Sequence, residues 1–170
     1  MKKTFLILIL FLNFSILNAN SNISYIDINL ILNNSIVGKS ISKHIKEIKD
    51  NKNKEFSLIE KKLLDKEKDL IKKKNIVKKD EFDNEVSLLT NEINKYRDQK
   101  NKFNNEIEEK KIKYTKIVLE TLNPIISKYV EDNSITIVFP KKNIIVAKKN
   151  LDITDPIIEL LNNKLKKIDF

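Results

Sequence analysis

Residues 82–118 read FDNEVSLLTNEINKYRDQKNKFNNEIEEKKIKYTKIV, and this stretch decides the fold because its apolar residues follow a heptad pattern. From Phe82 to Ile107 they recur at alternating steps of four and three, and Lys100 is the only polar residue in the series. Such spacing predicts an α-helix with one apolar seam, as in a coiled coil. The predicted seam consists of Phe82, Val86, Leu89, Ile93, Tyr96, Phe103, Ile107, Tyr114 and Val118.

A second apolar series precedes this helix and predicts a partner for it. Two of its steps, Ile45 to Phe56 and Ile59 to Leu70, are eleven residues long, which suits a nearly straight helix. A lysine-rich break separates the two series, and Asp80 after it is a suitable N-cap. The sequence therefore predicts a helical hairpin arm over residues 40–130, with its tip at about 72–79. Each limb would be about 50 Å long at ~1.5 Å per residue.

The first nineteen residues have the composition of a secretory signal peptide. Met1–Thr4 is short and basic, Phe5–Leu12 is uninterrupted apolar sequence, and Ala19 marks the expected cleavage point. An uncleaved membrane anchor is the alternative, but this apolar core is well short of the roughly 20 residues that a span needs. We therefore expect residues 1–19 to be removed on export.

The composition limits how the exported chain can be stabilised and what it can attract. The chain has no cysteine, so no disulfide can hold its fold. The formal net charge is +9, and removal of Lys2 and Lys3 with the signal leaves +7. A basic exported protein attracts acidic polypeptide, anionic lipid or nucleic acid, whereas a solvated lysine-rich helix surface explains the same charge without any partner.

Both ends of the mature chain predict short strands that would form a small body. Ile23–Ile28, Ile135–Phe139 and Ile144–Ala147 are rich in β-branched and aromatic residues, and the turn residues between the last two predict a hairpin. The body would comprise residues 20–39 and 131–170, a size at which a lone core is marginal. The expected fold class is α+β, a β-strand body with a protruding helical arm, and we expect the body to associate with other copies.

Further positions mark the places where the arm meets this body. Gly38 directly precedes the arm and predicts a turn, although a tight backbone approach would also suit a glycine. Asn123 and Pro124 predict an interruption of the second helix that acts as a hinge. Asp155 as N-cap and Pro156 as the first helical residue predict a C-terminal helix. Its apolar stripe would consist of Ile157, Leu160, Leu161 and Leu165.

The sequence contains no arrangement of residues typical of an enzyme or a cofactor site. His44 is the only histidine, and its apolar neighbours Ile41 and Ile45 make it a seam or surface residue. The acidic residues are spread along helix faces instead of being clustered as a metal site requires. One glycine is too few for a phosphate-binding loop. We therefore expect no catalysis, no metal and no cofactor.

The order of these parts resembles the Skp/OmpH family of periplasmic chaperones, and the resemblance covers the whole mature chain. It rests on the strand that contains Ile26-Asp27, the charged hairpin, and the segments Ile135–Phe139 and Ile144–Ala147. Its most specific part is LDITDPII, residues 151–158, which leads into an amphipathic helix. One departure is Asp132-Asn133-Ser134, where family members commonly have a glycine.

The resemblance implies a homotrimer in which strands of three protomers form a small barrel and three helical arms enclose a cavity. Unfolded outer-membrane β-barrel proteins would be held there, in the periplasm and without ATP, and so kept from aggregating. The family's lipopolysaccharide-binding patch cannot be transferred residue by residue, so contact with lipopolysaccharide or anionic lipid stays open. No nucleic acid is expected as a partner of such a chaperone. Two other classes stay open: a structural coiled-coil protein of the envelope, and a secreted basic binder of anionic lipid or nucleic acid.

Three sets of residues follow as candidate sites. The trimer body would use Ile23, Tyr25, Ile26, Ile28, Ile135, Ile137, Phe139, Ile145 and Val146. Client capture would use a diffuse patch near the tip, where nine lysines stand against three acids between residues 61 and 79, a local excess of six. These lysines are Lys61, Lys62, Lys66, Lys68, Lys72, Lys73, Lys74, Lys78 and Lys79. Asn123 and Pro124 would form the hinge, while Tyr96, Phe103 and Tyr114 are assigned to the seam.

Overall fold

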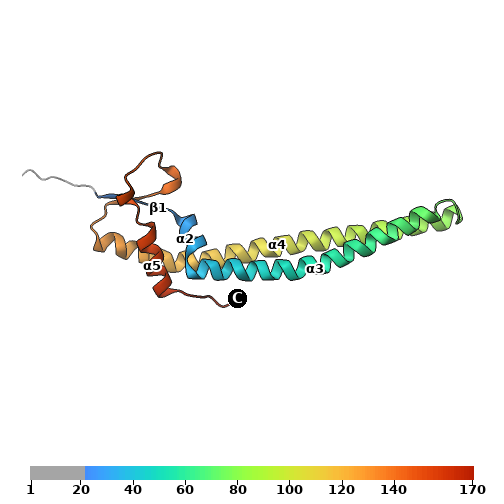
Figure 1. Cartoon of the computed structure of the whole chain (residues 1–170), viewed down its shortest axis with the longest axis horizontal. Helices are drawn as coiled ribbons and strands as arrows, with labels where there is room; N and C mark the ends of the chain where they lie inside the picture. The colour runs from blue at the N-terminus through green and yellow to red at the C-terminus, as the bar shows by residue number, and fades with distance from the viewer. Residues whose placement is uncertain (1–21) are drawn as a thin grey trace, which may run out of the picture.

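A computed structural model describes residues 22–170, and the predicted signal peptide lies outside these residues. The chain forms a long two-helix arm with a small body at one end of it (Figure 1). In chain order the elements are β1 (Ile23–Ile26), α2 (Ile28–Asn34), α3 (Ile36–Lys73), α4 (Lys79–Asp132), β2 (Ile137–Pro140), the short 3₁₀ turns η1 (Lys141–Asn143) and η2 (Lys149–Leu151), and α5 (Thr154–Lys164).

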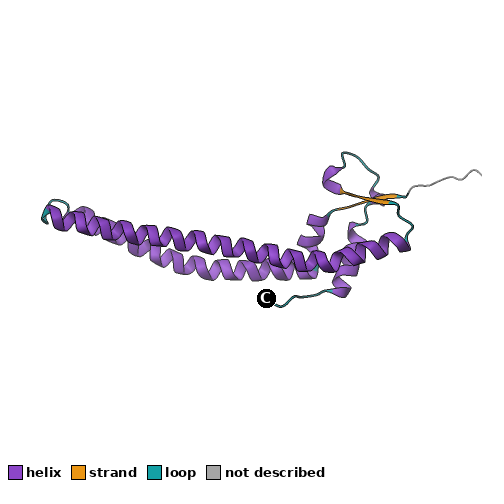
Figure 2. Cartoon of the chain, turned by 180° about the vertical axis from the view of Figure 1, so that it is seen from behind, coloured by secondary structure: helices purple, strands orange, loops and turns teal. Residues whose placement is uncertain are grey.

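The arm consists of α3 and α4, which lie side by side as an antiparallel hairpin (Figure 2). Phe56 of α3 meets Tyr96 and Phe103 of α4 edge to face, with both centroid distances at 5.7 Å. These rings are buried, as is Tyr114, so the heptad prediction and the assignment of the tyrosines to the seam are confirmed. The buried positions of α4 are Leu89, Tyr96, Phe103, Ile107, Tyr114, Val118 and Leu122. The predicted seam residue Val86, nearer the tip, is exposed.

The arm extends slightly beyond its predicted ends, from Ile36 to Asp132. At the tip, residues 74–78 connect the two helices, within the predicted range. The predicted N-cap at Asp80 is wrong, because Lys78 occupies that position without a side-chain hydrogen bond. Asp80 and Glu81 lie instead in the first turn of α4, where the helix dipole favours negative charge.

The body contains one parallel pair of strands, β1 and β2, in a register that places Ile23 opposite Ile137. The predicted hairpin is wrong, because β2 ends at Pro140 and residues 144–147 form no strand. The turn η1 follows β2 directly and separates this segment from it. Ile145 and Val146 are consequently 100% and 88% exposed. No strand within residues 22–170 pairs with them.

A buried junction between α2 and α3 forms the root of the arm. Asp27 caps α2 through its side chain, so Ile28, which was predicted to end the first strand, begins a helix. Buried Ser35 caps α3 by accepting a hydrogen bond from the Gly38 N–H at 3.1 Å. Gly38 thus lies in the first turns of a helix, and the predicted turn at this residue is wrong. A Cβ on Gly38 would lie 1.7 Å from the carbonyl oxygen of Leu32, so a tight backbone approach explains the glycine.

The helix α4 continues through Pro124 to Asp132, so the predicted interruption at Asn123-Pro124 is wrong. A proline removes one backbone hydrogen bond without ending a helix whose neighbouring residues are packed, and Leu122 here is fully buried. A hinge at this place stays a prediction.

The C-terminal helix begins at Thr154, two residues earlier than predicted, and Asp155 lies in its first turn instead of capping it. The N-cap residue is Ile153, and the Asp152 carboxylate before it accepts a hydrogen bond from the Thr154 N–H at 3.0 Å. Ile157 and Leu161 are buried against the arm root as predicted, whereas Leu160 is 42% exposed. The helix therefore presents a narrower apolar stripe than the sequence indicated.

Candidate functional site

The nine lysines predicted as a basic patch all lie in the outer part of the arm, and all are exposed. Six are on the last turns of α3, two are in the connecting turn, and the ninth begins α4. The structure therefore gathers them near the tip, as the sequence indicated.

Three of these lysines take part in ion pairs. Lys66 lies 2.6 Å from Glu92 and Lys73 lies 2.8 Å from Glu85, and both pairs join α3 to α4. The hydrogen bond that Lys73 donates to the Glu85 carboxylate raises the pKa of Lys73, which keeps its ammonium group charged. The third, Lys72, pairs with an aspartate on its own helix. Within residues 22–170 the other six lysines form no salt bridge.

The charge of the folded tip differs from the charge of its first limb alone. Within residues 61–92 the nine lysines meet eight acids, a net charge of +1, because α4 brings five further acids beside α3. The inner half of the arm, residues 36–60 and 93–130, carries 15 Lys and Arg residues against nine acids, a net charge of +6. The positive charge of the arm is therefore concentrated in the half nearer the body.

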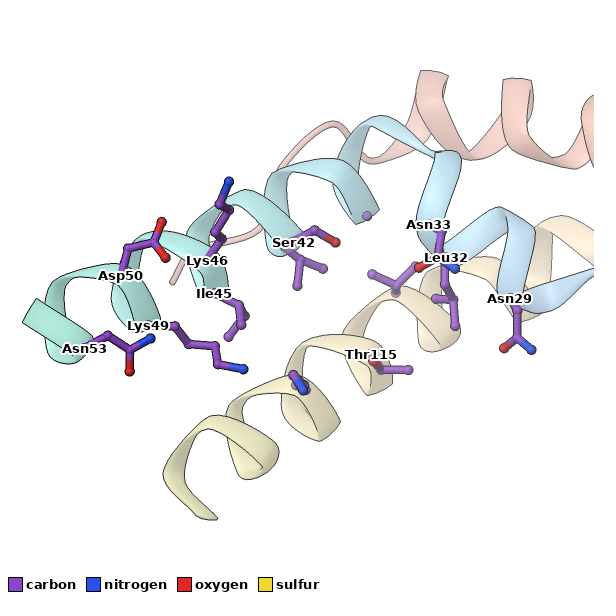
Figure 3. Close-up of a pocket in the computed structure, with 14 residues that line it drawn as sticks. Asn29, Leu32, Asn33, Ser42, Ile45, Lys46, Lys49, Asp50, Asn53 and Thr115 are labelled. Carbon is purple, nitrogen blue, oxygen red and sulfur yellow. The ribbon is translucent and has the colours of Figure 1, made fainter. Parts of the chain in front are cut away.

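A groove of about 610 Å³ lies in that inner half, between α2, α3 and α4; we call it the root groove (Figure 3). Along α3 its lining extends from Gly38 to Asn53, which is roughly 20 Å at ~1.5 Å per residue. Leu32, Ile41 and Ile45 supply apolar surface. The root groove is thus long and has an apolar part.

Amide and hydroxyl side chains from three helices also line the root groove. They are Asn29, Asn33, Ser42, Asn53 and Thr115. Within residues 22–170 none of these side chains forms a hydrogen bond, unlike Thr121, six residues farther along α4. Amides and hydroxyls are both donors and acceptors, so this groove offers unused hydrogen-bonding groups along its length.

The charged residues of the root groove are mostly basic. Lys46, Lys49 and Lys111 line it together with a single acid, Asp50. Figure 3 shows Lys49 extending from α3 toward α4, while Lys46 and Asp50 lie on the outer side of α3. Lys111 pairs with Glu108 at 2.6 Å, whereas Lys46 and Lys49 form no salt bridge among the described residues.

A polar contact midway along the arm fixes the register of its limbs. The Tyr96 hydroxyl donates a hydrogen bond to Glu60, and the Lys100 ammonium donates a second one at 3.1 Å. The hydrogen bond from Tyr96, assisted by Lys100, lowers the pKa of Glu60 below its ordinary value. Burial, together with the bond to Glu60, raises the pKa of Tyr96. These three side chains bond to one another, so they stabilise the hairpin and do not form a ligand site.

The residues predicted to form the trimer body differ in their exposure to solvent. Tyr25 and Ile26 are buried within the chain itself, and Ile28 and Ile135 are half-buried. The remaining five are at least 42% exposed: Ile23, Ile137, Phe139, Ile145 and Val146. In the described chain β1 pairs with β2 on one edge and bridges to Asp152, so the outer edge of β2 has no neighbour.

His44 packs among aromatic rings. It stacks on Phe170 at a centroid distance of 3.9 Å and meets Tyr114 edge to face at 6.1 Å. Among residues 22–170, no three potential metal-ligating side chains come together as an ion would require. None of the described helices has a segment that is both long and apolar enough to cross a bilayer.

The root groove was missed by the sequence analysis. Ser42, Lys46, Lys49 and Asn53 recur at steps of four, three and four, so a polar stripe beside the apolar seam was the available signal. The contribution of α2 depends on the tertiary junction at Ser35. No sequence pattern reports that junction.

Comparison with known proteins gives two findings. The model of the family described as outer membrane protein (OmpH-like) matches residues 22–161. A crystal structure described as that of an OmpH-like outer membrane chaperone from Caulobacter crescentus CB15 has a similar fold, with a TM-score of 0.74 at 21% sequence identity. The similarity covers 89% of this chain and 90% of that one. Comparison with curated proteins gives no significant match.

Proposed function

Because the chain belongs to the OmpH-like outer membrane protein family, we propose that it is a periplasmic chaperone of outer-membrane proteins. It acts as an ATP-independent holdase that binds unfolded outer-membrane β-barrel proteins between its arms and prevents their aggregation. The observation that carries the proposal is the family match, which extends from β1 through both arm helices into α5. A structural coiled coil would need the arm but not the body joined to it.

The surface of the arm suits weak and reversible binding of an unfolded chain. Leu58, Ile71, Ile76 and Ile112 are between 64% and 80% exposed, and lysine stems add further apolar surface between them. No single contact of this kind is strong, so release requires no energy source. Capture and release are therefore passive.

In this proposal the exposed lysines of the tip are the first groups to contact an acidic client. An exposed charge contributes about 0–1 kcal/mol, and its field is screened over ~8 Å at physiological salt. Reversal of one unpaired lysine, such as Lys62→Glu, should therefore change the affinity very little. The net charge of +7 on residues 22–170 also supports contact with anionic lipid or lipopolysaccharide. Nucleic acid is not part of the proposal.

The working form of the chaperone is a homotrimer built through the body. Five exposed apolar residues and the open edge of β2 support this assembly, because both are unfavourable in water and invite pairing with another chain. Association of three bodies would bring three arms together around a cavity. Export to the periplasm follows from the signal peptide expected at residues 1–19.

The test is an aggregation assay with mature protein. An unfolded outer-membrane β-barrel protein is diluted from urea with and without the chain, and light scattering is followed in the absence of ATP. We expect scattering to be suppressed at about one trimer per client. If a basic helical protein of the same charge suppresses scattering equally well, the holdase function is excluded.

A further inference from the structure

We propose that the root groove is the place where the arm grips an extended segment of an unfolded client that carries both acidic and apolar residues. This inference rests on the proposed function, and it adds the location and the chemistry of the contact. It differs from a tip-centred mechanism, because the tip lysines make only the first contact and the root groove holds the segment.

The shape of the root groove fits an extended chain. Its lining follows α3 from Gly38 to Asn53, roughly 20 Å, which matches about six residues of extended polypeptide at ~3.3 Å each. The apolar side chains of Leu32, Ile41, Ile45 and Val118 line part of it. A lipid headgroup is compact and would leave most of this apolar surface uncovered.

The unused polar side chains fit the backbone of such a segment. An unfolded chain presents N–H and C=O groups that need partners wherever they leave water. Asn29, Asn33, Ser42, Asn53 and Thr115 provide donors and acceptors from α2, α3 and α4. Because backbone groups are the same in every client, these contacts would not depend on client sequence.

The charge of the root groove fits acidic side chains. Three lysines line it, Lys46, Lys49 and Lys111, and only one acid, Asp50. The bond between Lys111 and Glu108 is on the surface, where an exposed ion pair is weak and easily exchanged for a client carboxylate.

A second cavity, at the tip, is smaller than the root groove, and its charged side chains already pair with one another. It has a volume of about 310 Å³ and is lined by Lys66, Lys73, Glu85 and Glu92. These four residues form the two ion pairs that join α3 to α4. A client carboxylate would have to displace a glutamate there, whereas Lys46 and Lys49 have no such competitor among the described residues.

The first experiment compares two variants with the same change of charge. The groove variant carries Lys46→Glu, Lys49→Glu and Lys111→Glu, and the tip variant carries Lys61→Glu, Lys62→Glu and Lys68→Glu. The probes are a short fluorescent peptide of leucine, serine and aspartate, and a matched peptide with lysine in place of aspartate. Fluorescence anisotropy with the full mature chain reports the affinity.

We expect the unaltered protein to prefer the acidic peptide. The groove variant should weaken its binding roughly tenfold or more, and the tip variant by less than about threefold, because only the former removes direct contacts. Equal losses in the two variants would overturn the inference. The inference would also be overturned if the groove variant lost binding to anionic phospholipid vesicles but bound the peptide as before. The root groove would then be a lipid site. A change of assembled mass in the groove variant would instead identify a second copy of the chain as the occupant.

A second experiment blocks the root groove without changing its charge. Ser42→Trp should lower the affinity for the acidic peptide. The control, Thr90→Trp, is at an exposed position of α4 nearer the tip of the arm and should not change the affinity. Bound peptide should also slow hydrogen exchange in residues 38–53 more than in residues 61–79. Equal effects of the two tryptophans, or protection confined to the tip, would exclude the root groove.

The two proposals fail in different ways. If the unaltered protein suppresses client aggregation and the groove and tip variants behave alike, the root-groove inference is wrong and the holdase function stands. If the unaltered protein does not suppress aggregation, the proposed function itself is wrong.

Discussion

The packing of α2 on α3 requires a residue without a side chain at position 38, and Gly38 meets this requirement. Its helical backbone passes so close to Leu32 that a Cβ would lie 1.7 Å from the Leu32 carbonyl oxygen. We expect Gly38→Ala to lower the free energy of unfolding by about 2 kcal/mol or more, because α2 must shift and this outweighs the ~1 kcal/mol gain in helix propensity. Urea denaturation measures the change.

Ser40→Ala is the matched control, because it also introduces an alanine into α3, two residues farther along the helix. It should change stability by less than about 0.5 kcal/mol. A Gly38→Ala protein as stable as the control would mean that α2 does not pack against the start of α3 in solution.

Glu60 makes the stability of the arm depend on pH. Hydrogen bonds from Tyr96 and Lys100 favour its ionised form and lower its pKa from the ordinary value of 4.5. Its contribution is therefore fully present above pH 4.5 and is lost as the pH falls through the lower pKa of the folded state. We expect Glu60→Gln to lower the melting temperature at neutral pH, with a difference that shrinks well below pH 4.5.

Thermal unfolding at neutral and acidic pH, followed by circular dichroism, tests this dependence. Glu67→Gln, an exposed carboxylate of the same helix without a salt bridge among the described residues, serves as the control. A melting-temperature difference for Glu60→Gln that stays constant down to low pH would show that the carboxylate is not held by these bonds.

Among the elements, the segment after α5 ties the body to the arm. Ile168 is buried in the core, and Phe170 lies on His44 of α3 and 5.4 Å from the ring of Tyr114 of α4. Among the described residues no backbone hydrogen bond holds residues 166–170, so side-chain packing alone keeps the segment in place.

We expect Phe170→Ala to speed hydrogen exchange roughly two- to tenfold around His44 and Tyr114, because an aromatic contact contributes about 0.5–1.5 kcal/mol. Exchange at the tip and in β1 should not change. Asp169→Ala, on the neighbouring exposed residue, is the control. Identical exchange in the two variants would show that the segment is detached in solution.

The helix α4 carries the predicted hinge at Asn123-Pro124. Pro124 has no N–H to bond the preceding turn, although the helix continues through it. Its side chain is exposed, so Pro124→Ala should restore a backbone bond without a clash and stabilise the protein by about 1–3 kcal/mol. Hydrogen exchange near residue 124 should become slower in this variant, while residues 74–78 should remain the fastest part of the arm. Uniform protection across residues 40–130 in the unaltered protein would exclude both the hinge and the mobile tip.

For the molecule as a whole, the sequence predicted what depends on local periodicity. The heptad steps from Phe82 to Ile107 placed Tyr96 and Phe103 correctly in the seam, because neighbours on one helix face are set by the chain itself. The balanced charge of the tip was not predictable, since it depends on the register that brings Glu85 and Glu92 beside α3. The root groove depends likewise on how α2 folds back at Ser35.

The segment Ile144–Ala147 shows a different limit. Its β-branched composition predicts a strand, and within one chain it is exposed and unpaired. Strand propensity describes how well a residue fits a half-buried pleated surface, so it cannot be realised without a neighbouring strand. A second copy of the chain is the natural source of that neighbour.

Assembly through the body can be tested with Ile137→Asp. Ile137 lies on β2, the strand with an open edge, and is 45% exposed in a single chain. If partner bodies cover it, the new carboxylate is buried without a partner, at a cost that exceeds what an interface contact supplies. We expect trimers of the unaltered protein in light scattering at micromolar concentration and monomers of Ile137→Asp, with the helical content of the arm retained. Asn150→Asp, an equal change of charge at an exposed position of the same body, should remain trimeric. A stable, monodisperse monomer of the unaltered protein would rule out the trimer, and with it a cavity enclosed by three arms.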